Sequence, residues 1–303
     1  MVVEEGFLEE AAKKDNTYKY FLGRVIMPSI KIVTDSTALI KEEILHKYGI
    51  EVVPLYVNFK DETIVDGTVE NAAIFEKIRK TQEIPSTSQP SPGDFVKVFE
   101  KIVQEGSEVI SIHISSGISG TVESAKTAAK IVDETRISVF DSYSTSAGLA
   151  MLVIAAAEAA EEGKNREEII DMLERLKSKL RVVFCPETLE YLKKGGRIGG
   201  AQALLGSLLQ IKPILYFYEG KIEPLDKVRT MKKALERLAN ELPGTAEGLQ
   251  VAIINAGAWE NCQKLLQIIN ERLPGIEVGF YELSPVIATH VGPVVGLAIL
   301  QHD

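Results

Sequence analysis

Residues 108–132 read EVISIHISSGISGTVESAKTAAKIV and contain the signals of a strand, a loop and a helix in immediate succession. The β-branched run at 108–113 is typical of a buried strand, and the spacing of apolar residues after position 121 is that of a helix. The loop between them combines two glycines with four hydroxyl side chains. A strand that passes through such a loop into a helix is the repeating unit of a parallel sheet covered by helices.

The same order recurs on both sides of this segment, between residues 30 and 179. Further strand-like runs read IKIVT, EVVPLYVNF and RISVFD, and stretches with helical spacing separate them. One helix start is marked by Ser91, Pro92 and Asp94, which supply a capping hydroxyl, a first-turn proline and an acid. The fold class predicted is therefore α/β, with a mostly parallel N-terminal sheet covered by helices.

Changes of sequence pattern along the chain predict two domains and an N-terminal extension. Residues 1–27 are acid-rich at their start and are expected to form an N-terminal extension, or a docking helix, ahead of an N-terminal α/β domain at 28–179. After position 179 the pattern changes, and PILYFYEGKIEPLDKV predicts a hairpin with its turn at Glu219 and Gly220. Residues 180–303 are expected to form a smaller C-terminal α/β domain.

Composition excludes several classes of protein. The 303 residues carry 34 basic and 43 acidic side chains, a net charge of −9, which argues against nucleic-acid or anionic-membrane partners. The apolar run at 147–157 is shorter than the roughly 17–25 residues of a transmembrane helix, so it predicts a buried helix instead. Cys185 and Cys262 are far apart, and the four histidines show no close pairing. We therefore expect a cytoplasmic protein with no transmembrane segment and no metal site.

Hydroxyl-rich segments at 87–92 and 115–121 are the candidate ligand site. Ligands of such sheets bind beyond the carboxyl ends of the strands, where several loops share one crevice. Hydroxyls and free N–H groups at the start of a helix suit a carboxylate or a phosphate, although ordinary helix capping explains each segment alone. Asp35 and Asp141 also follow strands, and could orient hydroxyls, bind a metal or act only as turn acids.

Three cationic positions stand near glycine-rich segments or element ends. The run 195–200, GGRIGG, lacks the GxxxxGK[ST] pattern and follows a helical segment, so it is not a nucleotide loop. Its Arg197 could pair with a carboxylate of the other domain. His290, in IATHVGP, and Arg229, in DKVRT, are the other candidates for contact with an anionic group.

Six motifs in this order resemble the DegV family of fatty-acid-binding proteins, which includes the lipid-carrying subunit of bacterial fatty acid kinase. They are IVTDST at 32–37, TSQPSP at 87–92, SSGISGT at 115–121, FDS at 140–142, LEYLKKGGRIGG at 189–200 and THVGP at 289–293. The likeness extends over nearly the whole chain from Ile30, and residues 1–26 lie outside it.

The resemblance implies a two-domain DegV-like fold with one long-chain fatty acid, such as palmitate, bound between the domains. It implies that Thr87 and Ser119 hold the carboxylate. Secondary contacts to ligand or partner are expected at Ser88, Ser116, Gly120, Arg229, His290 and Arg197. The protein would be a non-catalytic carrier without a cofactor, and could present its fatty acid to the catalytic subunit of a fatty acid kinase.

A fatty acid needs a small anion site and a long dry tunnel, because each buried methylene contributes about 0.8 kcal/mol. The apolar segment at 201–217 is the candidate lining, although core packing explains it equally well. Its apolar members are Ala203, Leu204, Leu205, Leu208, Leu209, Ile211, Ile214 and Leu215.

A serine ester hydrolase is the alternative function. Ser119, His290 and either Asp35 or Asp141 supply the residue types of a triad. The sequence lacks the GxSxG elbow, however, and Gly117-Ile118-Ser119-Gly120 misses that spacing by one residue.

Overall fold

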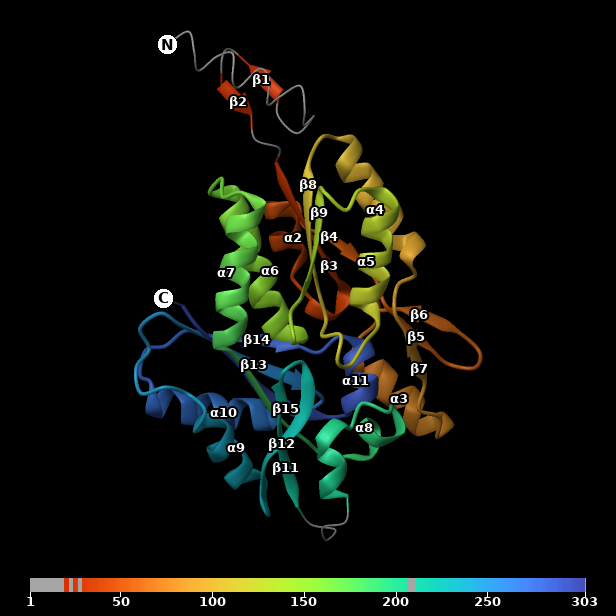
Figure 1. Cartoon of the computed structure of the whole chain (residues 1–303). Coiled ribbons are helices and arrows are strands. Elements are labelled where there is room, and N and C mark those ends of the chain that lie inside the picture. Colours follow the sequence, from red (N-terminus) through yellow and green to blue (C-terminus); the bar gives the residue numbers. More distant parts are fainter. Residues whose placement is uncertain (1–18, 22–23, 27–28, 206–210, 303) are drawn as a thin grey trace.

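The computed structural model describes residues 19–21, 24–26, 29–205 and 211–302 (Figure 1). In the predicted extension, β1 (Lys19–Phe21) pairs antiparallel with β2 (Arg24–Ile26). This part of the extension is therefore a strand pair and not the docking helix considered above. Residues 1–18 lie outside the described ranges.

The predicted parallel sheet is confirmed. Its strands are β3 (Ile30–Asp35), β4 (Glu51–Val53), β8 (Glu108–His113) and β9 (Ile137–Asp141), in the order β4-β3-β8-β9 with every pair parallel.

Helices cover both faces of this sheet (Figure 1). On one face α4 (Pro92–Gln104) and α5 (Thr121–Val132) share a core with Val33 and Val109. On the other lie α2 (Glu42–Tyr48), α6 (Ser146–Glu161) and α7 (Arg166–Lys179), around Ile32 and Ile110. The start of α4 is as predicted, because Ser91 and Asp94 form a reciprocal capping box ahead of Pro92.

The run EVVPLYVNF forms two strands rather than one. Proline has no N–H and cannot continue a hydrogen-bonded ladder, so Pro54 separates β4 from β5 (Tyr56–Asn58). Strand β5 pairs antiparallel with β6 (Thr63–Val65) and β7 (Ser86–Ser88) in a small separate sheet. The chain between β6 and β7 forms α3 (Asn71–Thr81). This sheet carries Thr87 at the centre of β7.

A second, mixed sheet follows from residue 180. Its strands are β10 (Leu180–Pro186), β11 (Lys212–Tyr218), β12 (Lys221–Val228), β13 (Leu249–Ala256), β14 (Val278–Glu282) and β15 (Val294–Gln301). The order is β12-β11-β10-β15-β13-β14, and only β13 and β14 are parallel. The predicted hairpin joins β11 to β12, where Glu219 and Gly220 both have positive φ, as a two-residue primed turn requires.

One face of this sheet packs on α9 (Met231–Ala239) and α10 (Trp259–Arg272). Short helices α8 (Glu190–Lys194) and α11 (Pro285–Val291) and two 3-10 turns, η1 (Ser36–Ala38) and η2 (Gly199–Leu204), complete the described part of the chain. Within those residues, no helix combines the length and the apolar composition needed to cross a bilayer.

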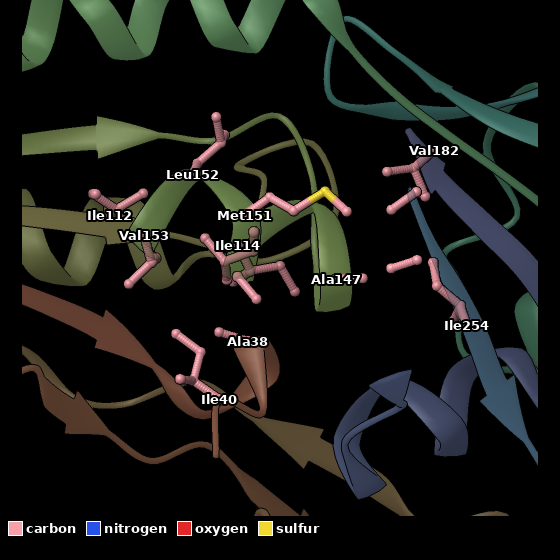
Figure 2. Close-up of a cluster of buried hydrophobic side chains, with 14 of the residues drawn as sticks. Ala38, Ile40, Ile112, Ile114, Ala147, Met151, Leu152, Val153, Val182 and Ile254 are labelled. Carbon is pink, nitrogen blue, oxygen red and sulfur yellow. The ribbon is translucent and has the colours of Figure 1, made fainter. Parts of the chain in front are cut away.

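Helix α6 joins the two sheets into one core. Leu149, Leu152 and Val153 have no exposed surface and Met151 has 2%, as the apolar run 147–157 predicted. Figure 2 shows Met151 and Leu152 among residues of the N-terminal half, whereas Ala147 faces Val182 and Ile254 of the second sheet. Residues 147–157 of the helix carry no polar side chain, so both sheets are needed to cover this part of it.

Helix α11 comes late in the chain but is anchored to the N-terminal half. The buried carboxylate of Asp66 accepts hydrogen bonds from the Val286 N–H at 2.9 Å and from the Ser36 hydroxyl at 2.7 Å. Asn71 donates to the carbonyl of Leu283 at 2.7 Å, just ahead of this helix. Burial raises the pKa of the Asp66 carboxyl despite these donors. The anchor places the last turn of α11 beside β7.

Candidate functional site

A cavity of about 330 Å³ lies between the loops of the N-terminal half and the second sheet. Its apolar wall combines residues of that sheet with residues from other parts of the fold, α11 among them. The sheet supplies Val182, Phe184, Phe217, Ile222, Ile254 and Val294, and the others are Leu55, Ile114, Ile118, Leu192, Leu283, Val286, Ile287 and Val291. Its polar wall consists of Thr87, Ser88, Gln89, Ser119, Thr145, Ser146, Arg197 and His290. A cavity of this size, mainly apolar with a few convergent polar groups, is typical of a small-molecule site.

The structure brings both predicted carboxylate ligands to this cavity. Thr87 reaches it from β7 and Ser119 from the loop between β8 and α5. Both side chains are half-buried. The Ser119 hydroxyl lies 2.9 Å from the hydroxyl of Thr121, so the start of α5 fixes its orientation.

The loop that carries Ser119 is fastened to the β11–β12 turn. The Ser115 hydroxyl donates to the carbonyl of Gly220 at 2.6 Å. Gly117 is so close to this turn that an added Cβ would lie 2.3 Å from the same carbonyl oxygen. The glycine is therefore required by the close approach of two chain segments.

His290 contacts Thr87 on the wall of the cavity. Its Nε2 lies 2.6 Å from Thr87 Oγ1, whereas its Nδ1 is buried and has no hydrogen-bond partner among the described residues. A proton on Nδ1 would be an unsatisfied buried donor, so we assign it to Nε2, which then donates to Thr87. This tautomer leaves the Thr87 hydroxyl hydrogen free to donate to a ligand.

Burial keeps this imidazole neutral. Desolvation, together with the positive charge of Arg197, lowers the pKa of His290 to about 4. The ring packs against Gly195, where an added Cβ would lie 2.3 Å from Nδ1. His290 can therefore orient a neighbouring hydroxyl at neutral pH but supplies no charge of its own.

Arg197 is the single charged residue on the described wall of the cavity. The suggested pairing with a carboxylate is wrong, because the guanidinium donates to the carbonyls of Ile118, at 3.2 Å, and Gly195, at 2.7 Å. The bond to Ile118 ties the loop after α8 to the loop that carries Ser119. A guanidinium has five N–H donors, so some remain for a ligand.

The other predicted contacts separate into cavity and surface positions. Ser88 lines the cavity and its hydroxyl accepts from Asn58. Gly120 is the N-cap of α5 and touches the Gln89 amide, outside the cavity wall. Ser116 is exposed, and its N–H donates to Asp141 at 3.2 Å. Arg229 is exposed just beyond β12, away from the cavity.

The hydrolase triad is not assembled. Asp35 is fully buried and accepts from the N–H of Ile114 and from Nδ1 of His113, whose Nε2 lies 2.6 Å from Ser111 Oγ. These three side chains have no exposed surface and do not line the cavity. Since Asp141 holds Ser116, neither carboxylate is placed to orient His290.

The expected tail lining is mostly wrong. Within the segment 201–217 only Phe217 lines the cavity, and Leu208 and Leu209 lie outside the described residues. Ile214 belongs to the core under α9, on the other face of the sheet. Side chains alternate between the faces of a strand, and the sequence does not say which face meets the cavity.

Sequence reasoning assigned no ligand contact to three polar residues of the wall. Gln89 lies inside the TSQPSP motif, and its Nε2 donates to Ser124 of α5 at 3.0 Å. Thr145 and Ser146 start α6, directly after the strand RISVFD. Their position after a strand of the same sheet is the signal that could have identified them.

The fold and the cavity define a class of α/β proteins with two sheets and a ligand-sized, mainly apolar cavity between them. The family model described as "Uncharacterised protein, DegV family" matches residues 29–302, and the chain belongs to this family.

Relatives match the chain over nearly their whole length. Protein DegV of Bacillus subtilis is 38% identical over 269 residues, 87% of this chain and 96% of the relative. A Thermus thermophilus DegV family structure, solved for its fatty acid binding, is 38% identical with a TM-score of 0.85, over 90% of this chain and all of that one. The structure of B. subtilis DegV, described as a fatty acid binding protein, is 36% identical with a TM-score of 0.79. The match covers 91% of this chain and all of that one.

The neutral His290 makes stability depend on pH in a predictable direction. A folded-state pKa of about 4 lies below the ordinary value of 6.5, so the unfolded chain binds the proton more tightly. Relative to His290→Gln, the wild type should lose on the order of 2–3 kcal/mol of unfolding free energy from about pH 7.5 to about pH 4. Urea denaturation across this range measures the difference. His46→Gln, at an exposed position, is the control, and parallel curves for wild type and His290→Gln would contradict the prediction.

Proposed function

We propose that this protein binds a long-chain fatty acid, such as palmitate, between an N-terminal domain at 28–179 and a C-terminal domain at 180–303. The observation that carries the proposal is the composition of the cavity wall, in which a large apolar part adjoins hydroxyls and one cation. An amphipathic ligand with a small anionic head and a long hydrocarbon tail matches both parts.

The carboxylate would lie where Thr87, Ser119 and Arg197 meet. The hydroxyl hydrogens of Thr87 and Ser119 can donate to its oxygens, and Arg197 supplies the positive charge. His290 acts through Thr87, whose Oγ1 it holds at 2.6 Å from Nε2. The −9 charge of the whole chain opposes an anionic ligand, so these local donors must outweigh it.

The tail would lie on the inner face of the second sheet. Gly296 of β15 stands directly opposite Phe184 on β10 and Ile254 on β13, both of which line the cavity. A Cβ added at Gly296 would lie only 2.9 Å from the Cβ of Phe184, so the glycine lets Phe184 pack closely against this strand. At about 0.8 kcal/mol for each buried methylene, the tail supplies most of the affinity and the head fixes the orientation.

Solved relatives support this ligand. The B. subtilis and T. thermophilus proteins are described as fatty acid binding, and a relative from Eubacterium ventriosum, 26% identical, as binding stearic acid. The described residues contain no group of three or more His, Cys, Asp or Glu side chains able to hold a metal ion. The proposed role is non-catalytic binding without a cofactor.

Bound lipid is the direct test. Protein purified from bacteria, denatured and extracted with organic solvent should release long-chain fatty acid in near-stoichiometric amount, identified by mass spectrometry. An empty protein that also fails to take up added palmitate would contradict the proposal. Hydrolysis of an ester, lost in Ser119→Ala, would favour the alternative hydrolase.

Substitutions of the head-group residues should weaken binding. Ser119→Ala and Thr87→Val each remove one hydrogen bond to a charged group, so each should raise the dissociation constant by about 10- to 100-fold, from about 1.5–3 kcal/mol per bond. Displacement of a fluorescent acyl probe measures the effect. Ser116→Ala is the matched control, because this neighbouring serine is exposed and outside the cavity wall. Equal losses in all three variants would contradict the assignment of the site.

We further propose that the protein carries its fatty acid in the cytoplasm and presents it to a fatty acid kinase. A surface groove lined by Lys194, Gly195 and Pro85 adjoins the cavity and shares Thr87, Arg197 and His290 with it. The groove gives a second protein a route to the carboxylate end of the ligand.

Presentation should depend on surface cations that do not bind the ligand. Arg229 is exposed and away from the cavity, so Arg229→Glu should lower acyl-phosphate formation by an added fatty acid kinase and ATP, with fatty acid affinity unchanged. Lys227→Glu, two positions earlier on the same exposed strand end, shows whether the effect is specific to the site or due to net charge. Absence of acyl phosphate with the wild-type protein would exclude the presenting role while leaving binding intact.

A further inference from the structure

The start of α6 brings two unused hydroxyls to the cavity wall. Thr145 is 5% exposed and Ser146 is 1% exposed, and both residues line the cavity. Neither Oγ1 of Thr145 nor Oγ of Ser146 has a hydrogen-bond partner among the described residues. Buried polar groups are usually paired, so two unpaired hydroxyls at one place require an explanation.

Helix capping does not explain them. Thr145 is the N-cap of α6 and threonine is a favoured capping residue, yet it makes no side-chain cap bond. By contrast, Ser91, Asn165 and Thr230 cap α4, α7 and α9 with their side chains. The first N–H groups of the 16-residue α6 therefore add further donors at the same place.

The charge at this place suits a neutral oxygen rather than a second carboxylate. Arg197 is the single charged residue of the described cavity wall, and the carboxylate site already uses it. A second anion at α6 would be stabilised only by the helix dipole and neutral donors, and burial of a charge with no full counter-charge is unfavourable. A hydroxyl can both accept from and donate to the groups at the helix start.

The hydroxyls of Thr145 and Ser146 lie next to the proposed carboxylate site. The N–H of Ser115 donates to the carbonyl of Ser144 at 2.8 Å, which holds the start of the Ser119 loop against the segment just before α6. A group bound at Thr145 and Ser146 would therefore belong to the half of an acyl chain nearer its carboxyl group.

From these observations we propose that Thr145 and Ser146 form a subsite for a hydroxyl group on the acyl chain, so that the protein prefers hydroxylated over unsubstituted long-chain fatty acids. The proposal rests on the proposed function, because it assumes that the acyl chain occupies this cavity. An unsubstituted chain leaves both hydroxyls unpaired, whereas a hydroxylated chain pairs them.

Competition binding against a fluorescent acyl probe tests the preference. The competitors are palmitic acid and a series of hydroxypalmitic acids with the hydroxyl at successive positions along the carboxyl-proximal half. At least one isomer should bind on the order of 2- to 10-fold more tightly than palmitic acid, the effect of one or two added hydrogen bonds. Weaker binding of every isomer would overturn the proposal and would indicate that ordered water pairs the two hydroxyls.

Substitution identifies the residues responsible. Thr145→Val combined with Ser146→Ala should abolish the preference, so that palmitic acid and the hydroxypalmitic acids bind with affinities within about 2-fold of each other. A cooperative thermal unfolding transition shows that the variant is folded. Thr127→Val, at an exposed position of α5, is the control and should keep the preference. A preference retained in the double variant would overturn the assignment. Failure of both palmitic and hydroxypalmitic acids to bind the wild type would instead refute fatty acid binding altogether.

Discussion

The burial of α6 is the constraint on which the arrangement of the molecule depends. Its residues 147–157 are apolar all round, and a single sheet covers only one side of such a segment. The parallel sheet takes one side through Ile32 and Ile110, and the second sheet takes another through Val182 and Ile254. Each large side chain buried in this way contributes about 1.5–3 kcal/mol, so separation of the two sheets would expose a continuous apolar strip. The two halves are therefore held face to face by a core that they share.

The site follows from this arrangement. The carboxyl ends of the parallel strands meet at the edge that faces the second sheet, so the loop with Ser119 and the start of α6 both lie over its apolar surface. The opposite wall is completed by α11, which Asp66 and Asn71 hold beside β7. The raised pKa of the Asp66 carboxyl shows that its burial is unfavourable for the charged form, which the hydrogen bonds from Val286 and Ser36 partly offset. The Thr87–His290 contact thus depends on an anchor at the far end of a seven-residue helix.

Local signals predicted one wall of the site better than the other. Strand, loop and helix follow each other in 108–132, and the rule that ligands bind beyond the carboxyl ends of parallel strands indicated the loop with Ser119 as part of the site. Thr87 lies instead at the centre of β7 in an antiparallel sheet, and its role was implied by the family resemblance. The apolar wall has no such signal, because β11 alternates between a face toward the cavity, with Phe217, and a face toward α9, with Ile214. The partners of Arg197 were unpredictable for another reason. They are backbone carbonyls, which every residue has and no side-chain pattern reveals.

The described wall of the cavity carries one full charge, and this determines which groups of a ligand the cavity can distinguish. His290 is neutral because it is buried against Gly195 and near Arg197, so one guanidinium provides the only full positive charge on the described wall. Neutral donors then define where an oxygen can lie, at Thr87 and Ser119 and again at Thr145 and Ser146. An uncharged hydroxyl attracts an ion less strongly than a second cation would, but it discriminates between a bound oxygen and a bound methylene, because a buried donor left unpaired is unfavourable. A chain with net charge −9 can in this way select an anionic, partly polar ligand by the positions of its hydrogen bonds rather than by its overall field.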